Sequence, residues 1–121
     1  MPVTIGLTQV EVEAIIGALE EERAKKQKLW IDLSITYNAT KAIMSDDVLH
    51  VVDYRDLEKE CRQMAVNEFY LLESFAENLA ELFISKYPIV SIELTVAKKA
   101  YGIQADRSFV SVKKTAQVYL S

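Results

Sequence analysis

Four polar side chains stand at the ends of predicted elements, where they are free to meet a ligand: Glu22, Tyr54, Glu73 and Lys98. Glu73 falls in the first turn of a helix predicted from about Leu72 to Ser85, where the helix dipole favours a carboxylate. A carboxylate can also accept two parallel N–H bonds from the edge of a planar heterocycle. Position alone favours the first interpretation and leaves the second open.

The other three side chains have ordinary interpretations too. Tyr54 begins a predicted helix, where a tyrosine usually packs on a sheet, although a free hydroxyl can transfer protons. Glu22 belongs to a charge run, residues 20–23, of the kind that is usually solvated. Lys98 and Lys99 follow a predicted strand, where lysines are usually exposed, and a lysine becomes a base only through burial or a cationic neighbour. Taken singly, none of them indicates a function.

General catalytic motifs and metal sites are missing from the sequence. It has no Gly-rich phosphate loop, no G-x-S-x-G and no H-E-x-x-H. With one histidine, His50, and one cysteine, Cys61, a single chain cannot supply the several ligands of a zinc site. We expect His50 to be structural or exposed and Cys61 to be an inert core residue. The sequence therefore offers no motif for a metal site, and we expect neither a metal nor a cofactor.

Length and charge restrict the class of protein. The 121 residues suit one domain, residues 1–121, and 50% of them are hydrophobic. A net charge of −4 argues against nucleic-acid binding. The single cysteine fits a reducing compartment, and no apolar run approaches the roughly 18 residues of a membrane span. We therefore expect a soluble, cytoplasmic protein with no nucleic-acid or membrane partner.

Four stretches alternate between apolar and polar residues and predict strands: residues 3–14, 29–37, 89–96 and 108–119. In the first, the apolar face changes between Leu7 and Val10, as at a bulge. Residues 18–27 are predicted to be a charged loop, and residues 100–106 a turn. Each pair of strands therefore forms a hairpin.

Two helices are predicted between the hairpins, after a possible helical turn at 39–43. Asp53 is a good N-cap residue, and Asp56 three positions later resembles a capping box. The first helix breaks at 67–70. The apolar face of the second comprises Leu72, Phe75, Ala76, Leu79, Ala80 and Phe83.

The order β-β-α-α-β-β predicts an α+β fold, a four-stranded antiparallel sheet with both helices on one face. Such a sheet keeps two open edges, which invite pairing with another copy of the chain. Closing several sheets into a barrel removes the edges, so a ring of identical subunits is a physical expectation.

The four polar residues stand within four recognisable stretches: Ile15-Ile16-Gly17 with Glu22 and Gln27-Lys28-Leu29; Ser45-Asp46-Asp47-Val48 with Asp53-Tyr54; Phe69-Tyr70-Leu71-Leu72-Glu73 with Ala76-Glu77; and Lys98 with Ile103. In this order and at these spacings, the stretches resemble the dihydroneopterin aldolase family, including its relative the dihydroneopterin triphosphate epimerase. The run Lys98-Lys99-Ala100-Tyr101-Gly102 lacks the proline that aldolases commonly have after the lysine. Whether Lys98 or Lys99 enters the site is therefore open, and the acidic run at 20–22 is more like the epimerase.

The resemblance implies a T-fold whose subunits close into a barrel-shaped ring, a tetramer or two stacked rings in an octamer, with active sites between neighbours. Glu73 would bind the amino-pyrimidinone edge of a pterin, and the backbone of Leu72 would add hydrogen bonds. Tyr54 would come from the adjacent subunit and stack near the ligand. Val52 would line that pocket.

The implied reaction is a retro-aldol cleavage of 7,8-dihydroneopterin by a carbon–carbon lyase of folate biosynthesis. Lys98 would take the 2′-hydroxyl proton, directly or through water, and the pterin ring would accept the electrons. Glu22 would help to manage protons and water, and Tyr54 could return a proton to the enol carbon. Recombination of the fragments on the other face would give 2′-epimerisation.

Two alternatives remain open. A triphosphate 2′-epimerase would need extra cations near the substrate side chain, and Lys25, Lys99 or Arg107 could supply them. A ring-forming pterin-binding protein without enzymatic activity would use the same scaffold, because a fold does not determine a function.

Overall fold

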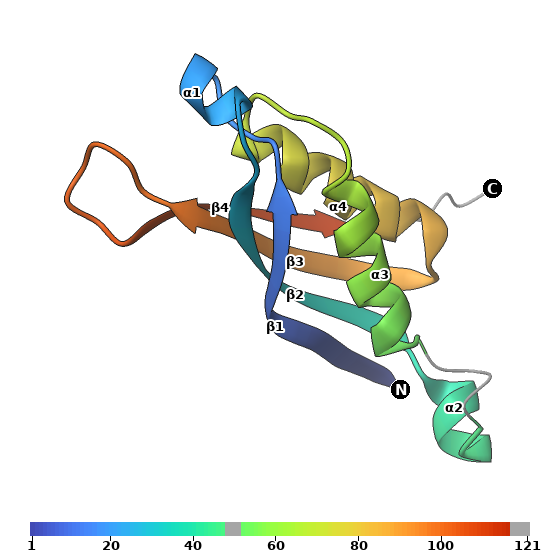
Figure 1. Ribbon diagram of the computed structural model, residues 1–121. Helices are drawn as coiled ribbons and strands as arrows, with labels where there is room; N and C mark the ends of the chain where they lie inside the picture. The colour runs from blue at the N-terminus through green and yellow to red at the C-terminus, as the bar shows by residue number, and fades with distance from the viewer. Residues whose placement is uncertain (48–51, 117–121) are drawn as a thin grey trace.

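The computed structural model describes residues 1–47 and 52–116 (Figure 1). The predictions for His50 and for the last residues of the final predicted strand lie outside these ranges. Within the part described, no helix is long and apolar enough to cross a membrane.

A single sheet contains four strands in the order in which the chain makes them, each antiparallel to the next. They are β1 (Pro2–Ala14), β2 (Gln27–Asn38), β3 (Ile89–Lys99) and β4 (Arg107–Thr115). All four predicted strands are present, and β3 is three residues longer than its apolar alternation indicated because it continues through two lysines to Lys99.

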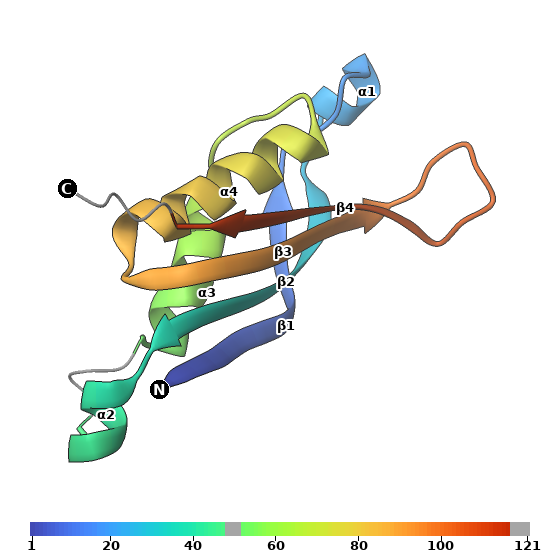
Figure 2. The same ribbon diagram turned by 180° about the vertical axis from the view of Figure 1, so that it is seen from behind.

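Four helices accompany the sheet: α1 (Glu20–Arg23), α2 (Thr40–Ser45), α3 (Tyr54–Met64) and α4 (Leu72–Lys86). The two long ones, α3 and α4, lie on the same face, α3 against β1 and α4 against β3 and β4 (Figures 1 and 2). The predicted α+β architecture is therefore confirmed. The short helices extend from opposite ends of the sheet.

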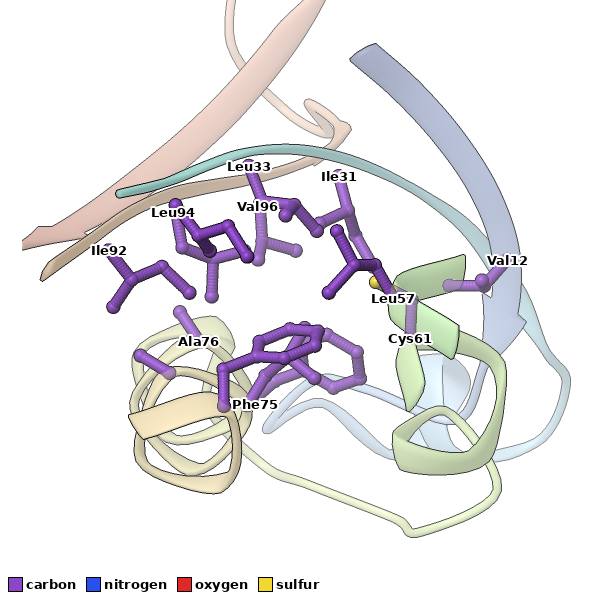
Figure 3. Packing of buried hydrophobic residues seen from close by; sticks show 14 of the residues in the cluster. Val12, Ile31, Leu33, Leu57, Cys61, Phe75, Ala76, Ile92, Leu94 and Val96 are labelled. Atoms are coloured by element: carbon purple, nitrogen blue, oxygen red, sulfur yellow. The ribbon is translucent and has the colours of Figure 1, made fainter. Parts of the chain in front are cut away.

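The core lies between the sheet and the two long helices (Figure 3). Alternate residues of β2 from Leu29 to Tyr37 and of β3 from Ile92 to Val96 point into it, and Leu29, Ile31, Leu94 and Val96 have no exposed surface. Cys61 is buried there as predicted, and burial raises the pKa of its thiol to about 12, so it stays protonated at neutral pH.

The predicted bulge in β1 is confirmed by its pairing with β2, whose register shifts between Leu7 and Val10. Gln9 takes a left-handed conformation there, with φ of 54°. The Asp32 carboxylate stabilises this conformation, because it accepts bonds from the backbone N and the side-chain Nε2 of Gln9 at 2.7 and 3.0 Å.

Two local predictions need correction. The predicted charged loop contains α1, a helix of one turn that is too short to show a hydrophobic period in the sequence. At the start of α3, Asp53 is the N-cap as predicted, but its carboxylate accepts from the backbone N of Arg55 at 2.8 Å and also binds the Arg55 guanidinium at 3.1 Å. The Asp53 side chain therefore bonds to Arg55, whereas we expected a capping box between Asp53 and Asp56.

Candidate active site

A partly buried ion pair joins two residues that are far apart in the sequence. Lys98 Nζ lies 2.8 Å from Glu22 Oε2, and the two side chains are only 21% and 16% exposed. Glu22 comes from α1, whereas Lys98 comes from the end of β3, opposite Leu29 of β2. Glu22 is therefore partly buried, although its position in a charge run had favoured a solvated side chain.

Strand geometry explains why Lys98, and not Lys99, enters this pair. Successive residues of a strand point to opposite faces, so Lys98 shares the face of the buried Leu94 and Val96. Lys99 points away, with its Nζ 5.6 Å from the ring centroid of Tyr101. The pleat of β3 therefore explains why Lys98, rather than Lys99, forms the ion pair with Glu22.

The ion pair changes the acidity of Glu22. The hydrogen bond and charge of Lys98 lower the pKa of the Glu22 carboxyl below its usual 4.5, against the opposing effect of burial. The backbone N of Leu19 also donates to Glu22 Oε1, at 3.3 Å. At neutral pH Glu22 is therefore a carboxylate, held 2.8 Å from the Nζ of Lys98.

Gln27 supports the same carboxylate, and we gave it no role from the sequence. Its Nε2 donates to the backbone O of Ile16 at 2.6 Å and lies 3.4 Å from Glu22 Oε2. Its Oε1 is buried and has no hydrogen-bond partner among the residues that the structure describes. Gln27 lies two residues before the buried Leu29 and therefore on the same face of β2. This spacing could have predicted from the sequence that Gln27 points toward the core.

Gly17 allows Glu22 to approach the sheet. Its φ of 132° is strained for any residue with a side chain, and a Cβ there would lie 2.4 Å from Glu22 Cδ. The glycine thus provides both the turn after β1 and the space for the carboxylate.

Glu73 is brought to the same end of the sheet by the segment before α4. Phe69 pairs with Ile16 as an isolated parallel bridge, in which Gly17 N donates to Phe69 O and Phe69 N donates to Ile15 O, both at 3.2 Å. These bonds tie the start of α4 to the end of β1, so that the start of α4 lies close to α1 (Figure 1), and Glu73 is in the first turn of α4.

Two cavities flank the ion pair. One, the anchor pocket, has a volume of about 310 Å³; its lining includes Glu22, Tyr70, Leu72, Glu73 and Lys98. The other, the lysine pocket, has a volume of about 420 Å³; its lining includes Glu22, Lys25, Gln27, Lys98, Lys99 and Tyr101. Both cavities also reach Ser108, which pairs with Lys98 across the β3–β4 ladder. The ion pair therefore stands between two spaces.

Tyr54 and Val52 lie elsewhere in the chain. Both stand at the start of α3, beside α2 and at the end of the sheet away from α1 (Figure 1). Tyr54 is 52% exposed, whereas Val52 packs into the core with 7% exposure. One chain therefore brings together Glu22, Leu72, Glu73 and Lys98, and keeps Val52 and Tyr54 apart from them.

Of the three extra cations considered for a phosphorylated substrate, Lys25 and Lys99 line the lysine pocket. Arg107 instead lies over the ring of Trp30, with Cζ 3.5 Å from the ring centroid. Among residues 1–47 and 52–116, no three His, Cys, Asp or Glu side chains gather closely enough to hold a metal ion.

A family model described as dihydroneopterin aldolase matches residues 5–115. The dihydroneopterin aldolase of Escherichia coli K12 is 33% identical over 92 residues, 74% of this chain and 75% of that protein. The dihydroneopterin triphosphate 2′-epimerase of Pseudomonas aeruginosa is 30% identical over 95 residues, 78% of this chain and 77% of that protein. The crystal structure of the E. coli aldolase in complex with neopterin has a TM-score of 0.87 at 25% identity, covering 93% of this chain and 98% of that chain. This similarity confirms the predicted T-fold of the subunit.

Proposed function

Because the chain belongs to the dihydroneopterin aldolase family, we propose that it is a cytoplasmic carbon–carbon lyase that cleaves 7,8-dihydroneopterin. The products are 6-hydroxymethyl-7,8-dihydropterin and glycolaldehyde, a step of folate biosynthesis. The observation that supports this proposal most strongly is the Glu22–Lys98 ion pair, which shares the anchor pocket with Glu73.

Glu73 binds the flat edge of the pterin in this proposal. Its carboxylate accepts two parallel N–H bonds from the amino group and ring nitrogen of the pyrimidinone, a bidentate contact that fixes orientation. Leu72, beside it in the anchor pocket, offers backbone groups at the start of α4, where the first N–H groups have no partner inside the helix. The ring is thereby held in a plane with its side chain toward the ion pair.

Lys98 and Glu22 then handle the protons. Glu22, whose lowered pKa makes it a weak proton acceptor, holds the Lys98 amine in place, while Lys98 passes its proton to water and then takes the proton of the 2′-hydroxyl. The C1′–C2′ bond breaks, glycolaldehyde leaves with C2′ as its carbonyl carbon, and the bonding electrons move into the pterin ring. Tyr54 gives a proton to C1′ and regains one through water, which yields the hydroxymethyl product.

Tyr54 reaches this site from a second copy of the chain, and Val52 lines the pocket beside it. Within one chain, the start of α3 and the anchor pocket lie at opposite ends of the sheet (Figure 1). A tetrameric or octameric homo-oligomer can place the start of α3 of one copy against the anchor pocket of the next. Tyr54 and Glu73 then meet in one site, and the open sheet edges are covered.

A second candidate is the 2′-epimerisation of dihydroneopterin triphosphate. The P. aeruginosa relative carries this name, and Lys25 and Lys99 add two cations to the lysine pocket beside the ion pair. A triphosphate chain in that pocket would be stabilised by charge-assisted hydrogen bonds. The cleavage chemistry would be the same, followed by recombination on the other face of the fragment.

The test is to incubate the pure protein with 7,8-dihydroneopterin and, separately, with its triphosphate, and to separate the products by chromatography. We expect 6-hydroxymethyl-7,8-dihydropterin from the first substrate. A 2′-epimer formed faster from the triphosphate would favour the second candidate. Tight pterin binding without turnover of either substrate, over a range of pH, would instead indicate a binding protein and contradict both enzymatic proposals.

A further inference from the structure

The helix α1, which carries Glu22, is held in place by polar contacts. It is one turn long, it buries none of its residues, and the preceding Leu19 is 60% exposed. An isolated helical turn is unstable in water, because few bonds offset the cost of fixing its backbone. The position of Glu22 must therefore be fixed by contacts made from α1 to other segments.

Arg23, the next residue, makes four such contacts. Its Nη1 donates to the backbone O of Phe69 at 3.0 Å and to that of Gly17 at 3.4 Å. Its Nη2 lies 3.5 Å from Glu68 Oε2, and its Cζ lies 4.2 Å from the ring centroid of Tyr70. The side chain is 23% exposed, so these contacts are partly shielded from water.

The segment that Arg23 contacts, residues 68–70, leads directly to Glu73. Tyr70 and Leu71 are 65% and 51% exposed, so apolar burial holds this segment only weakly at its last residues before α4. Arg23 therefore joins α1, which buries none of its residues and carries Glu22, to a segment that Phe69 anchors to the core and whose last two residues before α4 are exposed. Both carboxylates, and Tyr70 itself, line the anchor pocket.

From this geometry, and resting on the function proposed above, we propose that Arg23 is a positioning residue. It sets the distance between the Glu22–Lys98 ion pair and the ligand anchor Glu73. A guanidinium suits this task because its planar set of donors can serve two carbonyls and a carboxylate at once while its face lies on an aromatic ring. A lysine has a single charged point and cannot make all four contacts.

The experiment compares Arg23→Met and Arg23→Lys with Arg62→Met as a matched control. Arg62 lies on α3, forms an ion pair with Glu58 of the same helix, and has a side chain that is 59% exposed. For each variant we would measure kcat and KM for 7,8-dihydroneopterin, the Kd of a pterin without a side chain, the melting temperature, and the pKa of Glu22 by NMR.

We expect Arg23→Met to lower kcat about 100-fold, the cost of displacing a catalytic group by about 1 Å. The Kd of the side-chain-free pterin should stay unchanged, because that ligand needs only the anchor. Arg23→Lys should give an intermediate loss, and Arg62→Met none. The Glu22 carboxyl pKa should rise toward its usual value in Arg23→Met and to a smaller extent in Arg23→Lys, and should not change in Arg62→Met.

An unchanged kcat in Arg23→Met, or a parallel loss of kcat, pterin affinity and melting temperature, would overturn the proposal and leave Arg23 a purely structural residue. Should Arg23→Met fail to fold, the same readouts apply to Arg23→Lys. If the unaltered protein turns over no dihydroneopterin, the proposed function fails, and the Glu22 pKa alone decides the role of Arg23. A pKa that stays lowered in the Arg23 variants then overturns it.

Discussion

The two ends of the sheet differ in what they offer a ligand. At the end of the sheet where α1 lies (Figure 2), Glu22, Glu73 and Lys98 line one cavity, the anchor pocket, and Glu22 is bonded to Lys98 of β3. At the α2 end, Tyr54 is half exposed at the start of α3, and Val52 beside it is buried in the core. The α1 end has a pocket lined by two carboxylates and a lysine, whereas the α2 end has an exposed tyrosine.

This difference indicates how the proposed site is divided. The strands between the two ends are 9–13 residues long, and a strand rises about 3.3 Å per residue, so the two groups cannot meet within one chain. A second copy brings them together if its α2 end lies at the α1 end of the first. The predictions below test this division, beginning with the largest expected effect.

The largest effect should come from the lysine at the α1 end. We expect Lys98→Met to reduce kcat by about 100-fold to 10,000-fold, the usual range for the loss of a general acid or base. Lys99→Met, which removes the neighbouring charge on the opposite face of β3, should reduce it far less for the unphosphorylated substrate. Steady-state kinetics on both variants measures this. A larger loss in Lys99→Met would reverse the assignment made from the pleat of β3.

Mixing variants of the two ends should restore activity. Glu73→Gln should weaken pterin binding by about 2 kcal/mol, roughly thirtyfold in Kd, since it removes a charged acceptor. Tyr54→Phe should lower kcat because it removes the hydroxyl that returns the proton. When the two variants are co-expressed, about a quarter of the shared sites would combine two intact halves.

Activity of the co-expressed sample above the mean of the two pure variants would therefore support a site shared between copies. The control is a mixture of the two variants purified separately and assayed without subunit exchange. If co-expression restores nothing, each site belongs to a single chain and the proposed division is wrong.

A smaller effect is expected at Gly17, which shapes only the α1 end. Gly17→Ala should destabilise the fold by about 1–3 kcal/mol, because its φ of 132° strains a residue with a Cβ. The new methyl group would also displace the Glu22 side chain from Lys98. Urea unfolding measures the stability, and Gly102→Ala is the matched control, since its φ is also positive at 76° but its added Cβ meets nothing within 4 Å. Equal loss of activity in both variants would contradict a specific role for Gly17.

The smallest effect concerns pH. The Glu22 carboxyl has a lowered pKa in the folded chain, so it contributes stability above its usual value of 4.5 and loses that contribution as the pH falls through the lowered value. The contribution of this ion pair at neutral pH is of the order of 1 kcal/mol or less. We would measure the free energy of unfolding in urea between about pH 7 and pH 3. It should fall less steeply with falling pH in Glu22→Gln than in the unaltered chain. Identical slopes would mean that the ion pair does not persist in solution.

Much of the scaffold follows from local rules. The face change between Leu7 and Val10 located the bulge, and Asp53 located the start of α3, because alternation and capping are properties of neighbouring residues. The four strands and both long helices followed in the same way. The fold is thus largely specified by residues close together in the sequence.

The site was harder to predict because its contacts are distant in sequence. Glu22 looks solvated in its charge run, and only the pairing of β2 with β3 brings Lys98 to it. Gln27 was missed, although its parity with Leu29 places it on the core side of β2. Lys98 likewise lies two residues after Val96, a spacing that places both on the same face of β3. Resemblance to a family assembled these residues, whereas composition and periodicity alone left each of them ordinary.

The turn between β3 and β4 projects beyond the sheet (Figure 1). Its exposed Tyr101 and Ile103 contribute to the lining of the lysine pocket. Such a turn tolerates changes of length and sequence at little cost to folding. Natural variation could therefore reshape the part of the pocket that receives a substrate's tail while Glu22 and Lys98 stay where the sheet and α1 hold them. Under the proposed function, a different substrate tail would be accommodated by new residues in this surface turn, with Glu22 and Lys98 unchanged.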